Sequence, residues 1–184
     1  MSAIEDGSGK GFRAKVTRLL ELSIRGVSRS EAAELIITDG LVWTIPFDVV
    51  DPTAEDDYFL YISNTGSTNL AITRIQVSST VAGTLELQKV TGTSVGGSAV
   101  TLVNRKLGSA NVPSSATIES AVDITGLTDA GVLEFIELVA DTGRNINLTD
   151  DPVIISPNTA AALLWTVATG ILTGNVTLAE LVAT

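Results

Sequence analysis

The stretch YFLYISNTGSTNLAITRIQVS, residues 58–78, decides the fold class of this 184-residue chain. Two runs rich in β-branched and aromatic residues, 58–63 and 70–78, flank the turn-forming residues 64–67 (NTGS). Runs of this length and composition, bounded by Gly, Asn and Ser, are typical of β-strands and not of helices. The stretch therefore predicts two strands joined by a short connection.

The same pattern continues along the rest of the chain. Turn signals recur every eight to fifteen residues after Asp57, and no stretch has helical periodicity. Further strands are predicted at residues 84–90, 99–104, 117–124, 132–139, 153–156, 161–168 and 176–182. About nine short strands and almost no helix predict an all-β protein with a β-sandwich, and the jelly roll is the form we expect in a protein that assembles.

Three of the predicted strands are apolar on both faces, at residues 58–62, 133–138 and 162–168. A sandwich buries one face of each strand, so a neighbouring subunit, the N-terminal segment or a loop must cover the other. We therefore expect a homo-oligomer, and a closed trimer by analogy with assembling jelly rolls. The apolar content of 45% fits buried subunit contacts and fits an unusually apolar monomer core equally well.

The beginning of the chain has a different character from the rest. We divide the chain into an N-terminal docking segment, residues 1–50, and a β-sandwich domain, residues 51–184. Residues 1–11 are rich in Gly and Ser and indicate a flexible lead-in. Residues 12–45 are predicted to form an extended arm of strands with one short helix.

The short helix is predicted to begin at Ser28, which has capping-box spacing with Glu31. The alternative is a strand at residues 35–38 that turns through Asp39 and Gly40, a strong hairpin signal. Both interpretations keep the strand at residues 41–45.

The arm is basic, whereas the body is acidic. The chain has eleven basic residues and a net charge of −10. Six of the eleven lie in residues 10–29, which carry a charge of +5, while residues 30–184 carry −13. A basic strip on an acidic body is more typical of a protein that binds another surface than of a free-standing enzyme.

Residues 12–17 (FRAKVT) alternate between apolar and cationic side chains, so a strand here has an apolar face and a cationic face. Several cations acting together would lock onto an acidic partner and make binding sensitive to salt. The alternative is that they pair with the chain's own acidic body. We assign partner binding to Phe12, Arg13, Lys15, Arg18, Arg25 and Arg29.

Several function classes are excluded or disfavoured by composition. The chain has no Cys and no His, which removes Ser-His-Asp and Cys-His catalysis and the usual zinc sites. We expect no enzymatic activity and no cofactor. The apolar run at residues 160–172 is too short for a membrane helix, the acidic body disfavours nucleic-acid binding, and residues 1–6 lack the features of an export signal.

A few acidic and aromatic side chains are candidates for catalysis, calcium binding or glycan binding. Glu134 and Glu137 are three apart on a predicted strand and should point to opposite faces, which does not suit paired carboxylate catalysis. The pairs at residues 56–57 and 150–151 fit solvated turns better than a catalytic role. Residues 55–57 (EDD) could ligate calcium, and Phe59 and Tyr61 are the candidates for a glycan-binding platform.

The opening motif GFRAKVT (residues 11–17), the element VSRSE (27–31) and the strands YFLYISN (58–64) and LAITRI (70–75) resemble virion accessory proteins of tailed bacteriophages. The resemblance covers roughly the first half of the chain, and its motifs have low specificity. It implies a β-sandwich body, self-association and attachment to the outside of the head, without enzymatic activity. No ligand or catalytic residues are implied.

The sequence thus predicts a capsid decoration or cement protein that is made in the host cytoplasm and resides on the virion surface. Its expected partner is the major capsid protein or another virion protein, bound through the N-terminal segment. The alternative is a receptor- or glycan-binding module of a phage tail or fibre.

Overall fold

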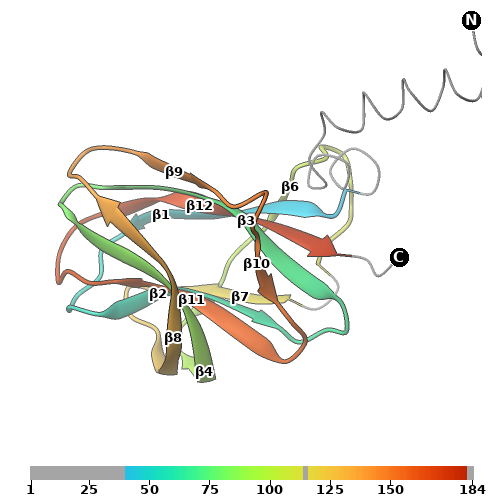
Figure 1. Cartoon of the computed structure of the whole chain (residues 1–184), viewed down its shortest axis with the longest axis horizontal. Helices are drawn as coiled ribbons and strands as arrows, with labels where there is room; N and C mark the ends of the chain where they lie inside the picture. Colours follow the sequence, from blue (N-terminus) through green and yellow to red (C-terminus); the bar gives the residue numbers. More distant parts are fainter. Residues whose placement is uncertain (1–39, 114–115, 182–184) are drawn as a thin grey trace, which may run out of the picture.

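The computed structural model describes residues 40–113 and 116–181, which form two antiparallel six-stranded sheets packed as a β-sandwich (Figure 1). These residues contain strands and turns and no helix. The short helix predicted near Ser28 and the arm before Gly40 lie outside the described residues. Among the described residues no helix is long and apolar enough to cross a membrane.

The first sheet, sheet A, has the strand order β10-β3-β12-β1-β6, and β9 also pairs with β3. Its strands are β1 (Val42–Val50), β3 (Asn69–Ser79), β6 (Val103–Asn104), β9 (Arg144–Asn147), β10 (Val153–Ile155) and β12 (Leu172–Leu181). The second sheet, sheet B, has the order β5-β7-β2-β11-β4-β8. Its strands are β2 (Asp57–Asn64), β4 (Gly83–Val95), β5 (Ser98–Ala99), β7 (Ala116–Ser120), β8 (Thr125–Leu138) and β11 (Thr159–Trp165).

The chain alternates between the two sheets at its beginning, from β1 to β2 to β3 to β4, and again at its end, from β11 to β12. The first and last strands are neighbours in sheet A: β1 pairs antiparallel with β12, from Val42 opposite Ala179 to Phe47 opposite Gly174. The strand predicted at residues 41–45 is thus part of the sandwich. The sandwich begins before residue 51, where the sequence-based division placed its start.

The main core lies between the sheets, where the inward side chains of both layers meet. Phe47 of β1 and Phe59 of β2 make an edge-to-face contact across it, with ring centroids 5.3 Å apart. Trp165 is fully buried at the end of β11, and its indole nitrogen donates to the Thr169 carbonyl at 3.1 Å. Burial of these rings supplies a large part of the apolar area that holds the layers together.

A second, smaller apolar cluster lies on the other side of sheet B. Tyr61, Val90, Ile124 and Ala162 are buried in it, with Leu127 packed against them. The cover comes from the chain between β7 and β8, which is attached by the bond from the Ile124 amide to the Tyr58 carbonyl at 2.7 Å. The second apolar face of β2 and β11 is therefore covered by the chain's own segment and does not need a neighbouring subunit.

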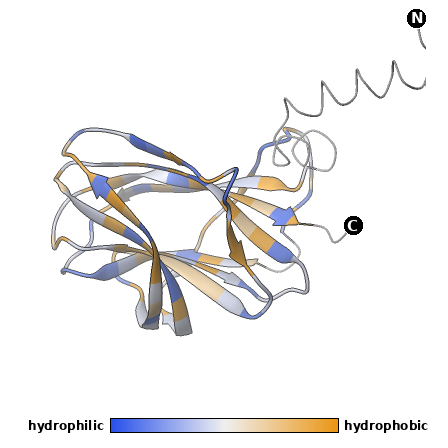
Figure 2. Cartoon of the chain, viewed as in Figure 1, coloured by the Kyte–Doolittle hydropathy of each residue, from blue (hydrophilic) through white to orange (hydrophobic). Residues whose placement is uncertain are grey.

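The strand boundaries differ from the sequence-based ones where glycine was taken as a strand end. β8 begins at Thr125 and runs through Gly126 and Gly131, both with positive φ, whereas we predicted a turn there. β4 and β8 pair through several register shifts, which bend the two strands. Glycine can adopt the positive φ that such bends require, so these positions stay within the strand. β9, with the largely hydrophilic sequence RNIN, lies within residues 143–147, which we interpreted as a connection between strands (Figure 2).

Two other predicted strands are shorter than expected. The strand predicted at residues 99–104 is divided into β5 and β6, which belong to different sheets. The strand predicted at residues 117–124 ends at Ser120. As a result Val122 is 47% exposed, although the alternation of the sequence placed it with the buried Ile118 and Ile124.

The second cluster can be tested with Ile124, which is 1% exposed, and its exposed neighbour Val122. We expect Ile124→Ala to lower the free energy of unfolding by about 2–5 kcal/mol, because it leaves a cavity under the covering segment. Val122→Ala is the matched control, and its effect should stay within about 0.5 kcal/mol. Chemical denaturation measures the free energy of unfolding of both variants. If Ile124→Ala lowers it as little as Val122→Ala does, the packing of Ile124 under this segment does not contribute to stability.

Tyr58 allows a test by pH. Burial raises the pKa of its phenol above 10.0, with further contributions from Asp129, Glu86 and Asp56. The folded chain then holds the phenol proton more tightly than the unfolded chain, so the stabilisation is complete below pH 10.0 and is lost as the pH rises through the raised pKa. We expect a smaller alkaline loss of stability in Tyr58→Phe, measured by denaturation at several pH values. An unchanged alkaline profile would contradict this assignment.

Candidate docking site

The residues assigned to partner binding, Phe12, Arg13, Lys15, Arg18, Arg25 and Arg29, lie outside the described part of the chain. Their role stays a prediction. What the structure describes is the place where this segment joins the sandwich, at Gly40 and the start of β1 (Figure 1). The surroundings of Gly40 are therefore the first candidate for a docking surface.

The loop that surrounds Gly40 starts from β6, which pairs with β1 through Trp43 opposite Asn104. Two hydrogen bonds hold the loop on the start of β1. The side-chain amide of Asn104 donates to the Gly40 carbonyl at 2.7 Å, and the backbone amide of Arg105 donates to the Val42 carbonyl at 2.9 Å. We call residues 103–112 the entry loop, because they surround the point where the N-terminal segment enters the sandwich.

The far part of the entry loop is also fixed. The indole nitrogen of Trp43, a fully buried side chain, donates to the Asn111 carbonyl at 3.0 Å, and Asn104 donates to the same carbonyl at 3.1 Å. Gly40 has φ +65°, and a Cβ there would lie 2.9 Å from the Ser109 hydroxyl oxygen, so the loop packs directly against the backbone of the entry point. The entry loop is thus attached near both of its ends to the start of β1.

Despite these bonds, the entry loop exposes apolar side chains. Leu107 is 90% exposed, Val112 73% and Val103 about half. Gly108 follows Leu107 with φ +86°, and no atom lies within 4 Å of its missing Cβ, so this tip projects into open space. Three large apolar side chains are thus exposed within ten residues, which makes this loop a candidate for contact with a partner.

The same loop carries cations. Arg105 and Lys106 are two of the five basic residues in the described chain, which contains fifteen acidic residues. The Arg105 guanidinium donates to the Thr177 hydroxyl at 3.2 Å, which holds its charge beside β12. Eight of the eleven basic residues of the chain are therefore in the entry loop or in residues 10–29, the segment that leads into it.

The side chains predicted for glycan binding are not available at the surface. Phe59 is fully buried in the main core, and Tyr61 is buried in the second cluster. Neither ring can serve as a stacking platform for a sugar. The two rings are buried on different faces of β2: Phe59 packs in the main core, and Tyr61 packs under the segment between β7 and β8.

The possible calcium site at residues 55–57 is a turn in the structure. The Asp57 carboxylate accepts from the Thr53 amide at 2.9 Å and from the Ala54 amide at 2.7 Å, which closes the turn before β2. Asp56 has φ +63°, as expected for an Asp in a tight turn. In the part of the chain that the structure describes, no three acidic side chains are grouped to hold a metal ion.

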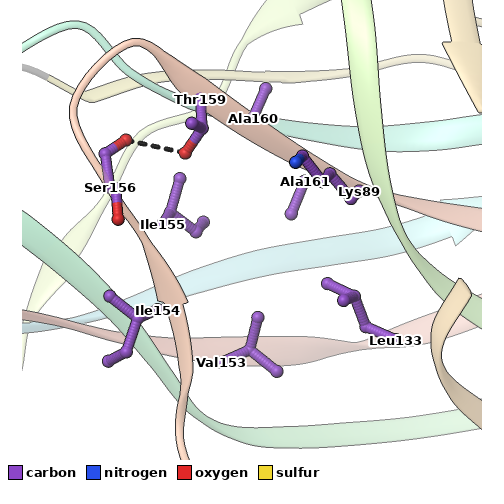
Figure 3. A pocket seen from close by; sticks show the side chains of 9 residues that line it. All are labelled: Lys89, Leu133, Val153, Ile154, Ile155, Ser156, Thr159, Ala160 and Ala161. Atoms are coloured by element: carbon purple, nitrogen blue, oxygen red, sulfur yellow. Dashed lines mark hydrogen bonds between the residues drawn. The ribbon is translucent and has the colours of Figure 1, made fainter. Parts of the chain in front are cut away.

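Two hollows lie along the side of the sandwich where β8 approaches β9 and β10. One, of about 310 Å³, is lined by Leu133 of β8, Lys89 of β4 and residues of β10 and β11 (Figure 3). The other, of about 550 Å³, lies between residues 134–137 of β8 and residues 143–146 around β9. Both Glu134 and Glu137 line this hollow: Glu134 is partly buried, whereas Glu137 is exposed and accepts a hydrogen bond from the Thr84 hydroxyl at 3.0 Å.

Sequence reasoning did not identify the entry loop, because residues 108–115 were interpreted as a connection. The one signal available was that Leu107 and Val112 are apolar within a stretch rich in Gly, Ser and Asn. That β6 places them beside Gly40 could not be foreseen, since β6 has only two residues.

No family model, curated protein or solved structure matches the chain, so the case for a function rests on the residues themselves.

Proposed function

We propose that this chain is a capsid decoration protein of a tailed bacteriophage, with no enzymatic activity. It resides on the outer surface of the virion after synthesis in the host cytoplasm, associates with copies of itself as a trimer, and docks on the major capsid protein through its basic N-terminal segment. The observation that carries the proposal is the entry loop, which exposes Leu107 and Val112 beside two cations where the basic segment joins the body.

This combination suits attachment to an acidic surface with apolar patches. Leu107 and Val112 would be buried on contact, and each Å² of apolar area removed from water stabilises the complex by roughly 25 cal/mol. The cations of the segment and of the loop would add ion pairs, which are individually weak but act together and speed up association with an acidic partner. The acidic remainder of the body would stay in solvent.

The strand order supports the more specific inference that the sandwich is a jelly roll. Four strands of sheet A follow the order β1-β12-β3-β10 and four of sheet B the order β2-β11-β4-β8. Taken in chain order, these eight strands alternate between the sheets except at β4 and β8, which are neighbours in sheet B, and the first and last strands are neighbours in sheet A, as in the double-sheet jelly rolls of viral proteins. The fold alone does not decide the function, which rests on the entry loop.

The entry loop gives the first test of docking. We expect Leu107→Glu with Val112→Glu to leave folding intact, because both side chains are exposed, and to abolish co-sedimentation with purified phage shells. Val139→Glu is the matched control, since Val139 is 64% exposed on another part of the sandwich. Unchanged co-sedimentation of the loop variant would contradict the proposal.

The basic segment gives the second test. We expect Arg25→Glu with Arg29→Glu to weaken shell binding at least about tenfold, which corresponds to ~1.4 kcal/mol, and the wild-type affinity to fall as salt is raised. The control is Arg74→Glu with Lys89→Glu, which changes the net charge equally but lies on the sandwich. Equal losses in both variants would show that net charge, and not this segment, determines binding.

A further inference from the structure

Lys89 lies on the inner face of sheet B, the face that β4 otherwise turns to the main core. Along β4 it follows Leu85 and Leu87, which are buried in that core. The three residues are two apart, and β4 pairs with β11 across them without a register shift. Alternate residues of a strand point to the same side, so Lys89 is directed toward the space between the sheets.

Two features leave an open space around Lys89. Its partner in β11 is Ala161, whose side chain is small. On the other side, register shifts before and after Gln88 bend β8 relative to β4 and leave Leu133 as an extra residue without a partner in β4. The space is the hollow of about 310 Å³ that Lys89 and Leu133 share with residues of β10 and β11 (Figure 3).

The wall of this hollow is mostly apolar. Ile155 and Ala161 belong to the main core, and Val153 packs against it. Leu133 and Ile154 also line the hollow, although they are 43% and 42% exposed. A ligand with an apolar chain would therefore remove from water some apolar surface that the chain itself leaves uncovered.

The polar groups of the hollow are few. Among the described residues that line it, Lys89 is the only charged one. Ser156 and Thr159 add two hydroxyls, and the Thr159 hydroxyl donates to the Ser156 carbonyl at 2.7 Å (Figure 3). Small-molecule sites typically combine an apolar wall with a small number of polar groups that orient the ligand. An ammonium in an apolar wall without a carboxylate selects a ligand that is both anionic and apolar.

The charge of Lys89 is available to such a ligand. Within residues 40–113 and 116–181 its ammonium has no hydrogen-bond or ion-pair partner, although these residues contain fifteen acidic side chains. The guanidinium groups of the same part of the chain all donate hydrogen bonds: those of Arg74, Arg105 and Arg144. Lys89 is also exposed, so a ligand can approach it from solvent.

The neighbouring hollow of about 550 Å³ has a different character. Glu134 and Glu137 line it together with Arg144, so charges of both signs already lie there. An anion in that hollow would meet two carboxylates, which repel it. The hollow that contains Lys89 is therefore the one that suits an anionic ligand.

We propose that the hollow of Lys89 binds a small amphipathic carboxylate. The carboxylate pairs with the Lys89 ammonium, and the apolar chain lies along Val153 and Ile155. A volume of about 310 Å³ is near the lower limit of the roughly 300–1,000 Å³ that small-molecule pockets span, so the chain is short. The hollow lies at the β10 edge of sheet A, whereas the entry loop is at the β6 edge, so this site is independent of the proposed docking.

Titration calorimetry of the full-length protein with butanoate, hexanoate and octanoate tests the site. We expect the affinity to rise by up to about fourfold for each added CH₂ group, because each group leaves water for the apolar wall.

Lys89→Met keeps the apolar stem of the side chain but removes the charge, and it should weaken octanoate binding at least about tenfold. Arg74→Met is the matched control, because it removes one positive charge from β3 outside the hollow, and it should bind octanoate like the wild type. Three results would each overturn the proposal: no binding or no dependence on chain length, equal losses in the two variants, or binding of 1-octanol as tight as that of octanoate.

Thiol labelling locates the bound ligand, because the chain has no cysteine of its own. A maleimide reacts with the thiol introduced by Leu133→Cys, and saturating octanoate should slow this reaction. Val139→Cys is the control, since Val139 is 64% exposed and does not line the hollow, and octanoate should leave its labelling rate unchanged. Equal rates with and without octanoate at Leu133→Cys, or equal slowing in both variants, would refute the site.

Discussion

The pairing of β1 with β12 is the constraint on which the rest of the structure depends. It joins residues that are more than a hundred positions apart and places the first described strand in the interior of sheet A. Gly174 marks how close the fit is: a Cβ at this position would lie 2.1 Å from the Gln76 carbonyl oxygen and 2.8 Å from the Phe47 ring. Only glycine fits at that point, between β1 and β3.

The position of the entry loop follows from this pairing. With β12 on one side, β1 offers its other side to β6, and Trp43 can then reach the Asn111 carbonyl. Hydrogen bonds thereby hold the loop on the start of β1, while Leu107 and Val112 remain exposed. In the proposed docking, a loop already held by hydrogen bonds would lose less conformational entropy on association than a loop without them.

The sequence was sufficient for the fold class and for most strands, because alternation and turn residues are local signals. It was insufficient where a strand is defined by its neighbour. Val122 followed the alternation of Ile118 and Ile124 but lies beyond the end of β7. The hydrophilic β9 is a strand because it pairs with β3, and Gly126 is inside β8 because it pairs with the bent β4.

The candidate docking site was even harder to predict from local sequence signals than the strands were. The charge of residues 10–29 is evident from composition. The position of the entry loop depends instead on the pairing of β6, a strand of only two residues, with β1, which brings the loop to Gly40. The expectation that two-faced strands need a neighbouring subunit was too general: β2 and β11 are covered by the segment that contains Ile124, and β8 is not. Local patterns identify apolar faces, but only the topology determines what covers them.

The order of the strands along the chain also has a consequence for synthesis. β12 follows β1 by more than a hundred residues, so β1 cannot take its place inside sheet A until that whole stretch of chain has been made. The basic residues 10–29 therefore precede, in synthesis, the strand that completes the sheet beside the entry loop. A chain that ends before β12 therefore has the basic segment but lacks the strand that holds β1, and with it the support of the entry loop.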